Sequence, residues 1–206
     1  MKKFLTWCVV LAVAWIAFKQ AQPLIRGLGL AEGVLVKDIP QQYHRQFPNP
    51  PSWVVGEWTV KPICGYRLNA RVLDTTTYSG DKMSDLAPID LAVAWGMMSD
   101  SAVLAKFRWE HGDREIRLFS KGELPASADD LCNCVSNIHA IPADENVRHM
   151  LLSFGRNSLI KLDGYLVEVS SKTKNAATRS SVWRNDRGNG ACEIMYVTSA
   201  GPMDQN

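Results

Sequence analysis

The sequence has almost no excess of charge of either sign. Its 206 residues carry 23 Lys and Arg against 21 Asp and Glu, which gives a formal net charge of +2. A disordered chain has a larger net charge and less apolar content than the 46% found here. Unspecific nucleic-acid binding requires many phosphates to be neutralised, so we expect no nucleic-acid partner. The length allows one ordinary globular domain with additional segments.

The sequence also lacks the short motifs that identify common active sites. It contains no Gly-x-Ser-x-Gly, no His-Glu-x-x-His and no phosphate-binding loop, and no internal repeat is apparent. We therefore predict no cofactor and no bound metal. Function has to be sought in single residues and in the location of the chain.

Long hydrophobic runs are scarce, and the relevant one lies near the N-terminus. Lys2 and Lys3 precede residues 4–18, an uncharged and mostly apolar run that Lys19 closes. A helix of this length spans about 22 Å, which is less than the ~30 Å hydrocarbon core, although flanking lysines can snorkel to the interfaces. This order of charge and apolar core is typical of a secretory signal or a signal anchor.

The absence of a convincing cleavage site after Lys19 favours an uncleaved anchor. With the lysine pair inside, the rest of the chain faces outward. We predict a single-pass protein of the bacterial inner membrane, with the lipid bilayer as partner of residues 4–18 and a domain facing the periplasm or the exterior. The alternatives are secretion after signal cleavage and a buried helix of a soluble protein.

Four segments follow from this reading. Residues 1–19 are a signal anchor or signal peptide, 20–52 a Pro-containing linker, 53–200 a compact β-rich extracytoplasmic domain, and 201–206 a tail. Prolines crowd the linker and forbid long helices there, because proline has no backbone N–H and clashes with a preceding helical turn.

Hydrophobic alternation predicts a β-rich α+β domain. Residues 106–118 alternate around His111-Gly-Asp and predict a hairpin, and Asp144 begins a predicted helix with an apolar stripe. Gly164 marks a change of alternation phase, which indicates a bulge or sharp bend. Residues 86–98 are predicted as a short helix. The order suggests a small OB-like barrel or a strongly bent antiparallel sheet with one or two helices, preceded by the N-terminal hydrophobic helix.

The cysteines favour disulfides if the domain lies in an oxidising compartment. Cys8 lies in the hydrophobic run, which leaves Cys64, Cys132, Cys134 and Cys192. Cys132 and Cys134 are too close in sequence to bridge each other comfortably, so we expect one link to Cys64 and one to Cys192. Free buried cysteines and a zinc site are the alternatives.

His139 is the first candidate for acid–base chemistry. If residues 136–141 form a strand, Asn137 and His139 share one face, and Asp90 is a candidate carboxylate partner. The alternative is a histidine that only fills a hydrogen-bonding role, with Asp90 as a cap or a solvated loop acid.

A polar loop supplies candidate ligand-binding residues. Residues 172–190 carry Arg179, Arg184 and Arg187 with a single acid, a composition suited to gripping a small anionic ligand or lipid headgroup. Asn137 is a further candidate. The alternative is a solvated hairpin loop.

Several short stretches are familiar in combination. They are LAPIDLAVAWG at 86–96 with MSD at 98–100, SNIHAIPA at 136–143, GYLV at 164–167 and DRGNGACE at 186–193. Together they resemble a group of uncharacterised bacterial proteins that are membrane-anchored or secreted. The resemblance covers residues 68–198, implies an envelope location and assigns no activity to any residue.

We therefore expect a membrane-anchored, extracytoplasmic module of the bacterial envelope that binds an envelope protein or a small anionic ligand. The alternative is an envelope hydrolase that acts on an anionic substrate with His139 as acid and base. A purely structural protein is the third alternative.

Overall fold

The computed structural model describes residues 33–43, 50–183 and 192–204. The predicted hydrophobic helix at 1–19 lies outside these residues. None of the helices in the described ranges has both the length and the apolarity needed to cross a bilayer.

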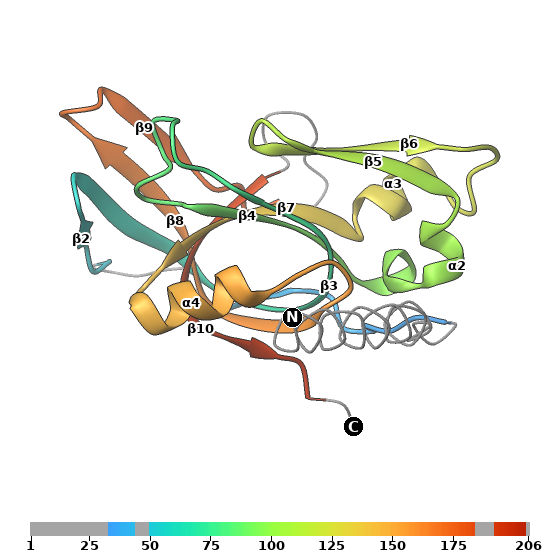
Figure 1. Ribbon diagram of the computed structural model, residues 1–206. Helices are drawn as coiled ribbons and strands as arrows, with labels where there is room; N and C mark the ends of the chain where they lie inside the picture. The colour runs from blue at the N-terminus through green and yellow to red at the C-terminus, as the bar shows by residue number, and fades with distance from the viewer. Residues whose placement is uncertain (1–32, 44–49, 184–191, 205–206) are drawn as a thin grey trace, which may run out of the picture. The chain divides into compact units, whose positions relative to one another are not determined.

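Eight strands form one mixed β-sheet (Figure 1). Their order in the sheet is β1 (Gln41–Tyr43), β3 (Trp58–Thr77), β4 (Ile89–Ala94), β7 (Val135–Pro142), β10 (Cys192–Pro202), β8 (Leu159–Ser171) and β9 (Ala176–Arg179), with β2 (Trp53–Val55) paired to β3. All neighbours are antiparallel except β7 and β10, which are parallel. The predicted β-rich fold is confirmed.

The predicted OB-like barrel is not what these strands form. The long strand β3 pairs with β8 through residues 59–71 and with β4 through residues 71–77, so the sheet bends strongly back toward its own longest strand. It remains a mixed sheet and not a closed barrel. The parallel β7–β10 pair also departs from the fully antiparallel sheet that we expected, because β10 inserts between β7 and β8 instead of joining an edge.

The irregularity predicted at Gly164 is present, and the partner strand carries it. The register between β8 and β10 shifts between Val197 and Ser199. A Cβ atom on Gly164 would lie 2.0 Å from the backbone oxygen of Tyr196, so only glycine permits this close approach of the two strands.

The helix predicted after Asp144 and the predicted hairpin are both confirmed. Helix α4 (Glu145–Ser153) begins where the Asp144 carboxylate accepts a hydrogen bond from the Val147 N–H at 2.9 Å. Strands β5 (Phe107–Gly112) and β6 (Glu115–Ser120) form a separate two-stranded sheet. Shorter helices are η1 (Gly96–Ser99), α2 (Ser101–Leu104) and α3 (Ala128–Cys132).

The helix predicted over residues 86–98 is wrong, because most of this stretch is strand β4 followed by η1. Every residue of β4 is buried, Asp90 included, so no solvent-exposed face gives the strand a period-two alternation. Part of the segment predicted as a linker packs with the domain, since Val36 lies in the core with 2% of its surface exposed. Strand β10 extends to Pro202, within the predicted tail.

Two different environments cover the two faces of the sheet. On one face α4 contacts β7 and β10 over a large apolar core that includes Ile89, Leu91 and Val93. On the other face the hairpin residue Phe107 packs with Ala92 and Ala94 of β4. The next residue on that second face of β4 is Asp90, and it begins the polar site described below.

Candidate functional site

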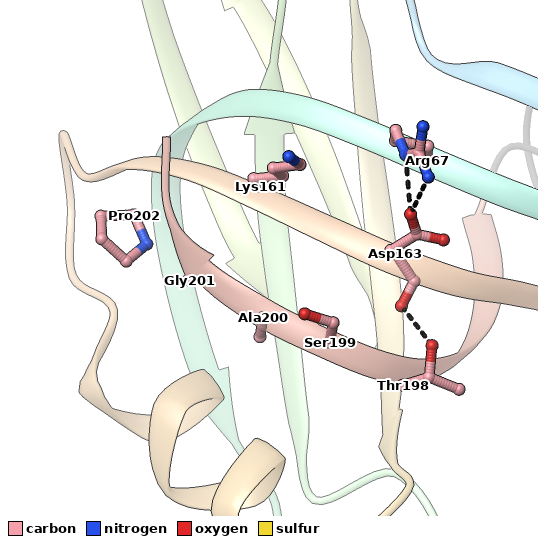
Figure 2. A pocket seen from close by; sticks show the side chains of 8 residues that line it. All are labelled: Arg67, Lys161, Asp163, Thr198, Ser199, Ala200, Gly201 and Pro202. Carbon is pink, nitrogen blue, oxygen red and sulfur yellow. Dashed lines mark hydrogen bonds and ion pairs between the residues drawn. The ribbon is translucent and has the colours of Figure 1, made fainter. Parts of the chain in front are cut away.

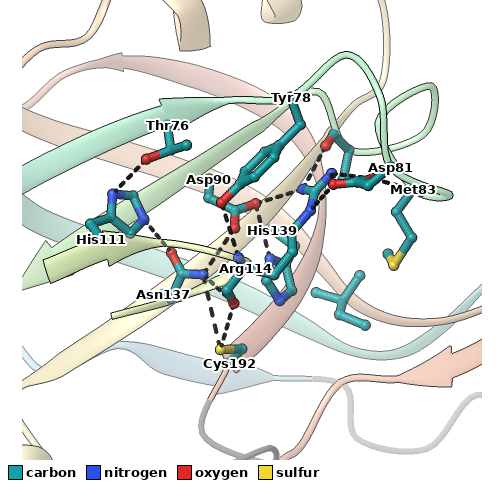
Figure 3. A network of polar contacts seen from close by, with 12 residues as sticks. Thr76, Tyr78, Asp81, Met83, Asp90, His111, Arg114, Asn137, His139 and Cys192 are labelled. Carbon is teal, nitrogen blue, oxygen red and sulfur yellow. Dashed lines mark hydrogen bonds and ion pairs between the residues drawn. The ribbon is translucent and has the colours of Figure 1, made fainter. Parts of the chain in front are cut away.

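Three neighbouring strands place a carboxylate, an imidazole and a thiol on one face of the sheet (Figure 3). Asp90 of β4 is directly opposite His139 of β7, and Asn137 of β7 is paired with Cys192 of β10. Because side chains alternate along a strand, residues 137 and 139 point to the same face. Pairing register alone therefore brings together residues that are far apart in the sequence.

Asp90 and His139 form the centre of the site. The Nδ1 atom of His139 lies 2.9 Å from Oδ1 of Asp90. Asp90 is fully buried and only 8% of His139 is exposed. Burial by itself would lower the pKa of His139, but the hydrogen bond to Asp90, the charge of that carboxylate and the nearby Cys192 side chain raise it to about 9. At neutral pH the ring is therefore an imidazolium.

The Cys192 side chain lies next to this pair. It is close enough to the His139 ring to raise the pKa of that ring, whose Nδ1 is occupied by Asp90. The thiol lies 3.4 Å from the backbone oxygen of Arg114, and the Asn137 amide nitrogen is 3.9 Å from its sulfur. Cys192 is partly exposed.

Arg114 at the tip of the β5–β6 hairpin ties the hairpin to this site. Its Nη1 lies 2.8 Å from Oδ1 of Asp90, and its Nε and Nη2 bind both oxygens of Asp81 at 2.8 and 2.9 Å. The guanidinium lies 3.8 Å from the centre of the Tyr78 ring. Burial would lower the pKa of Arg114, but the two carboxylates outweigh it and raise the pKa.

The hairpin turn itself is strained. Asp113 and Arg114 have φ angles of 50° and 66°, a left-handed conformation that residues other than glycine adopt at a cost. The contacts of the Arg114 side chain and of its carbonyl oxygen offset that cost. Strain of this kind gathers at functional sites.

Asn137 and His111 extend the network toward β3. The Asn137 amide nitrogen lies 3.1 Å from Oδ2 of Asp90 and 3.0 Å from the Arg114 carbonyl oxygen. Its oxygen lies 3.0 Å from Nε2 of His111, whose Nδ1 is 3.2 Å from the hydroxyl of Thr76. The network thus runs from β3 through the hairpin to β7, β4 and β10 (Figure 3).

This arrangement matches the requirements of nucleophilic catalysis by cysteine. A thiolate is the reactive form of cysteine, and an adjacent imidazolium stabilises it. A carboxylate on the far ring nitrogen holds the imidazole in one orientation and stabilises its protonated form. Cys192, His139 and Asp90 stand in that order.

The structure brings some of the predicted residues together and leaves others apart. His139, Asp90 and Asn137 lie in one network. Arg179 does not belong to it, because its side chain is 62% exposed and lies 3.9 Å from Glu168 on the neighbouring strand. Two other candidates, at positions 184 and 187, lie outside the described residues.

Sequence reasoning missed Cys192, Arg114 and His111 as members of the site. Cys192 was assigned to a disulfide, and the other two were interpreted as parts of a hairpin. The sequence does indicate a strand that includes Cys192. It does not indicate that this strand pairs with the strand of His139.

The cysteines do not support the disulfide prediction. No two cysteines within the described residues lie at disulfide distance, and Cys132, Cys134 and Cys192 have free thiols. Cys64 is buried in the core. The zinc alternative also lacks support, since the described ranges contain no group of three or more His, Cys, Asp or Glu placed to hold a metal ion.

A hollow of about 410 Å³ lies elsewhere, beside the bulge of β10 (Figure 2). Arg67, Lys161, Asp163 and residues 198–202 line it. Its charged groups are largely committed to one another: Nε of Arg67 donates to Asp163 at 2.6 Å, and the Tyr43 hydroxyl donates to the same carboxylate at 2.5 Å. Burial and that hydrogen bond raise the pKa of Tyr43 to about 12.

Comparison with protein-family models, with curated proteins and with solved structures finds no significant match for this chain. The functional argument therefore depends on the geometry of the site.

Proposed function

We propose that this protein is a cysteine-dependent hydrolase or acyl transferase, with Cys192 as nucleophile, His139 as acid and base, and Asp90 as the group that orients the imidazole. The observation that carries this proposal is the Asp90–His139–Cys192 row on adjacent strands β4, β7 and β10. It extends the predicted histidine hydrolase by a nucleophile that the sequence did not reveal.

The proposed reaction has two steps, acylation and deacylation of Cys192, and His139 gives a proton in the first and takes one in the second. The thiolate attacks a carbonyl carbon of an ester, thioester or amide, and a carbon–sulfur bond forms while the bond to the leaving group breaks. The His139 imidazolium gives its Nε2 proton to the departing atom. The neutral ring then takes a proton from water or another acceptor alcohol, which attacks the thioester and releases the thiolate. Asp90 stays ionised throughout.

We also propose an envelope location for this activity. It is supported by the lysine pair and the apolar run at residues 4–18, which favour a single-pass inner-membrane protein with its domain facing outward. An anionic substrate is a weaker part of the proposal, because Arg179 lies away from the site.

The binding module that we expected first stays a prediction. The hollow beside Lys161 offers a place for a small anionic ligand, and the Lys161 ammonium has no carboxylate partner among the residues that line it, apart from the Asp163 already paired with Arg67. Arg67 is already neutralised by Asp163 at the same place. The geometry therefore favours the enzyme over the binding module.

The test is the reactivity of Cys192 toward iodoacetamide in the full chain under reducing conditions, followed peptide by peptide with mass spectrometry. Cys132 is exposed and has no imidazole beside it in the described residues, so it is an internal control. At about pH 6 we expect Cys192 to react at least tenfold faster than Cys132, because a thiolate is the reactive form of cysteine and an adjacent imidazolium favours it. An activated ester should then acylate residue 192 in the unaltered chain and should leave residue 192 unmodified in Cys192→Ser.

Two results would refute the proposal. Equal alkylation of the two cysteines at about pH 6 would show that His139 does not activate the thiol. If Cys192 is alkylated rapidly but forms no thioester with any activated ester, it is a reactive thiol and not an acyl-transfer nucleophile.

A further inference from the structure

We propose that His111 is a positioning residue for the proposed catalytic pair, Cys192 and His139. It acts through Asn137, whose amide holds the Asp90 carboxylate toward His139. This inference rests on the proposed function, and it assigns a role to a hairpin residue that touches neither the nucleophile nor the base.

The orientation of the Asn137 amide follows from its neighbours. Its nitrogen lies 3.1 Å from Oδ2 of Asp90 and 3.0 Å from the backbone oxygen of Arg114. Both of these atoms only accept hydrogen bonds, so the amide must present its two N–H groups to them. Its oxygen then faces His111, whose Nε2 must carry a proton in order to donate across 3.0 Å.

His111 is held at both ring nitrogens. Its Nδ1 lies 3.2 Å from the hydroxyl of Thr76, which is paired with Asp90 across β3 and β4. In the neutral ring Nδ1 accepts the hydroxyl hydrogen, and this fixes the tautomer in which Nε2 donates. The ring therefore connects the hairpin with β3 and holds the position of the Asn137 amide from its oxygen side.

Loss of the His111 donor would affect His139 indirectly, through Asn137 and Asp90. The Asn137 amide would keep its two N–H donations, but its buried oxygen would lose the donor that holds it, so the side chain could shift away from Oδ2 of Asp90. The carboxylate would then turn, and its contact with His139 would weaken.

Other charged and titratable groups belong to the same network and limit the effect of losing His111. They are Tyr78 and Asp81 beside the hairpin tip, Arg114 in the hairpin turn, Asp90 on β4, His139 on β7 and Cys192 on β10. Arg114 continues to hold Oδ1 of Asp90 at 2.8 Å when His111 is changed. The loss should therefore be partial.

The experiment compares His111→Leu with His111→Gln, and the readout is the ratio of Cys192 alkylation rates at about pH 6 and about pH 10. In His111→Leu we expect this ratio to fall about tenfold, the effect of one hydrogen bond to a charged network. His111→Gln keeps a side-chain N–H for Asn137 and should retain most of the ratio. His149→Leu removes an exposed histidine of α4 and should leave the ratio unchanged.

The ratio separates positioning from general damage, because a loosened fold raises alkylation at both pH values. Should His111→Leu fail to fold, Thr76→Val removes the other partner of the same ring and should shift the ratio in the same direction.

An unchanged ratio in a folded His111→Leu would overturn the inference. So would an equal loss in His111→Leu and His111→Gln, since that would make ring packing the cause and not the donor. If Cys192 of the unaltered chain reacts no faster than Cys132, the proposed function fails instead.

Discussion

At the scale of single residues, the carboxylate of Asp90 is the centre of the molecule's polar chemistry. It is fully buried and accepts hydrogen bonds from Arg114, Asn137 and His139. A buried charge is strongly destabilising once a partner is removed, so these contacts are interdependent. The same residues that would serve catalysis therefore also hold the hairpin to the sheet.

His139 makes the stability of the fold depend on pH. Its pKa of about 9 lies above the ordinary histidine value of 6.5, so the folded state binds the proton more tightly than the unfolded chain does. The resulting stabilisation is fully present below about pH 6.5 and is lost as pH rises through about 9. The difference corresponds to about 3 kcal/mol. Urea unfolding at a series of pH values in that window measures it.

His139→Gln is the matched variant for this measurement, because it keeps a polar side chain that does not titrate. We expect the stability advantage of the unaltered chain over the variant to shrink from pH 6 to about pH 9. Parallel stability curves across that range would contradict the raised pKa of His139.

At the scale of elements, the close approach of β8 and β10 depends on Gly164. A Cβ atom there would lie 2.0 Å from the backbone oxygen of Tyr196, and backbone cannot move aside as a flexible side chain can. We expect Gly164→Ala to lower the free energy of unfolding by at least about 2 kcal/mol, in the range of overpacked sites. Denaturant unfolding checks the value.

Gly155→Ala serves as the control for that substitution. A Cβ atom on Gly155 would meet nothing within 4 Å, and the residue does not have a positive φ. Its effect should stay within about 0.5 kcal/mol of zero, as is usual for surface changes. Similar losses in the two variants would mean that the contact with β10 is not the cause.

Elements defined by local patterns were predictable from the sequence, and elements defined by distant partners were not. The hairpin at 106–118 and the helix after Asp144 depend on turn chemistry, capping and period, all of which neighbouring residues supply. Residues 86–98 were misassigned because burial on both faces removes the alternation of a strand. The OB-like barrel was predicted wrongly because the order of strands in a sheet depends on distant partners, and no local pattern shows where β10 inserts.

The candidate site shows the same division. The face shared by Asn137 and His139 followed from period two once a strand was assumed. Cys192 joins that face only through the parallel register of β7 and β10, and Arg114 only through docking of the hairpin. Those contacts link residues more than 20 positions apart, and no short motif encodes them.

At the scale of the whole molecule, the prediction concerns which side of a membrane the domain occupies. We expect full-length protein in the membrane fraction and, in intact spheroplasts, digestion of the domain by added protease. The physical reason is the transfer of the apolar run at 4–18 out of water, with Lys2 and Lys3 held inside. A cytoplasmic protein is the control for intact cells, and a domain that resists protease until the cells are permeabilised would contradict this topology.

The central position of β10 has a consequence for how the protein is made. The strand lies between β7 and β8 but follows both of them in the sequence, so each neighbour has one open edge until the ribosome has made β10. Open edges invite pairing with other chains, and a chain stopped before Cys192 would be prone to aggregate. The proposed nucleophile, Cys192, would also reach His139 only when β10 inserts, so a chain stopped before it would carry the histidine and the carboxylate without the sulfur.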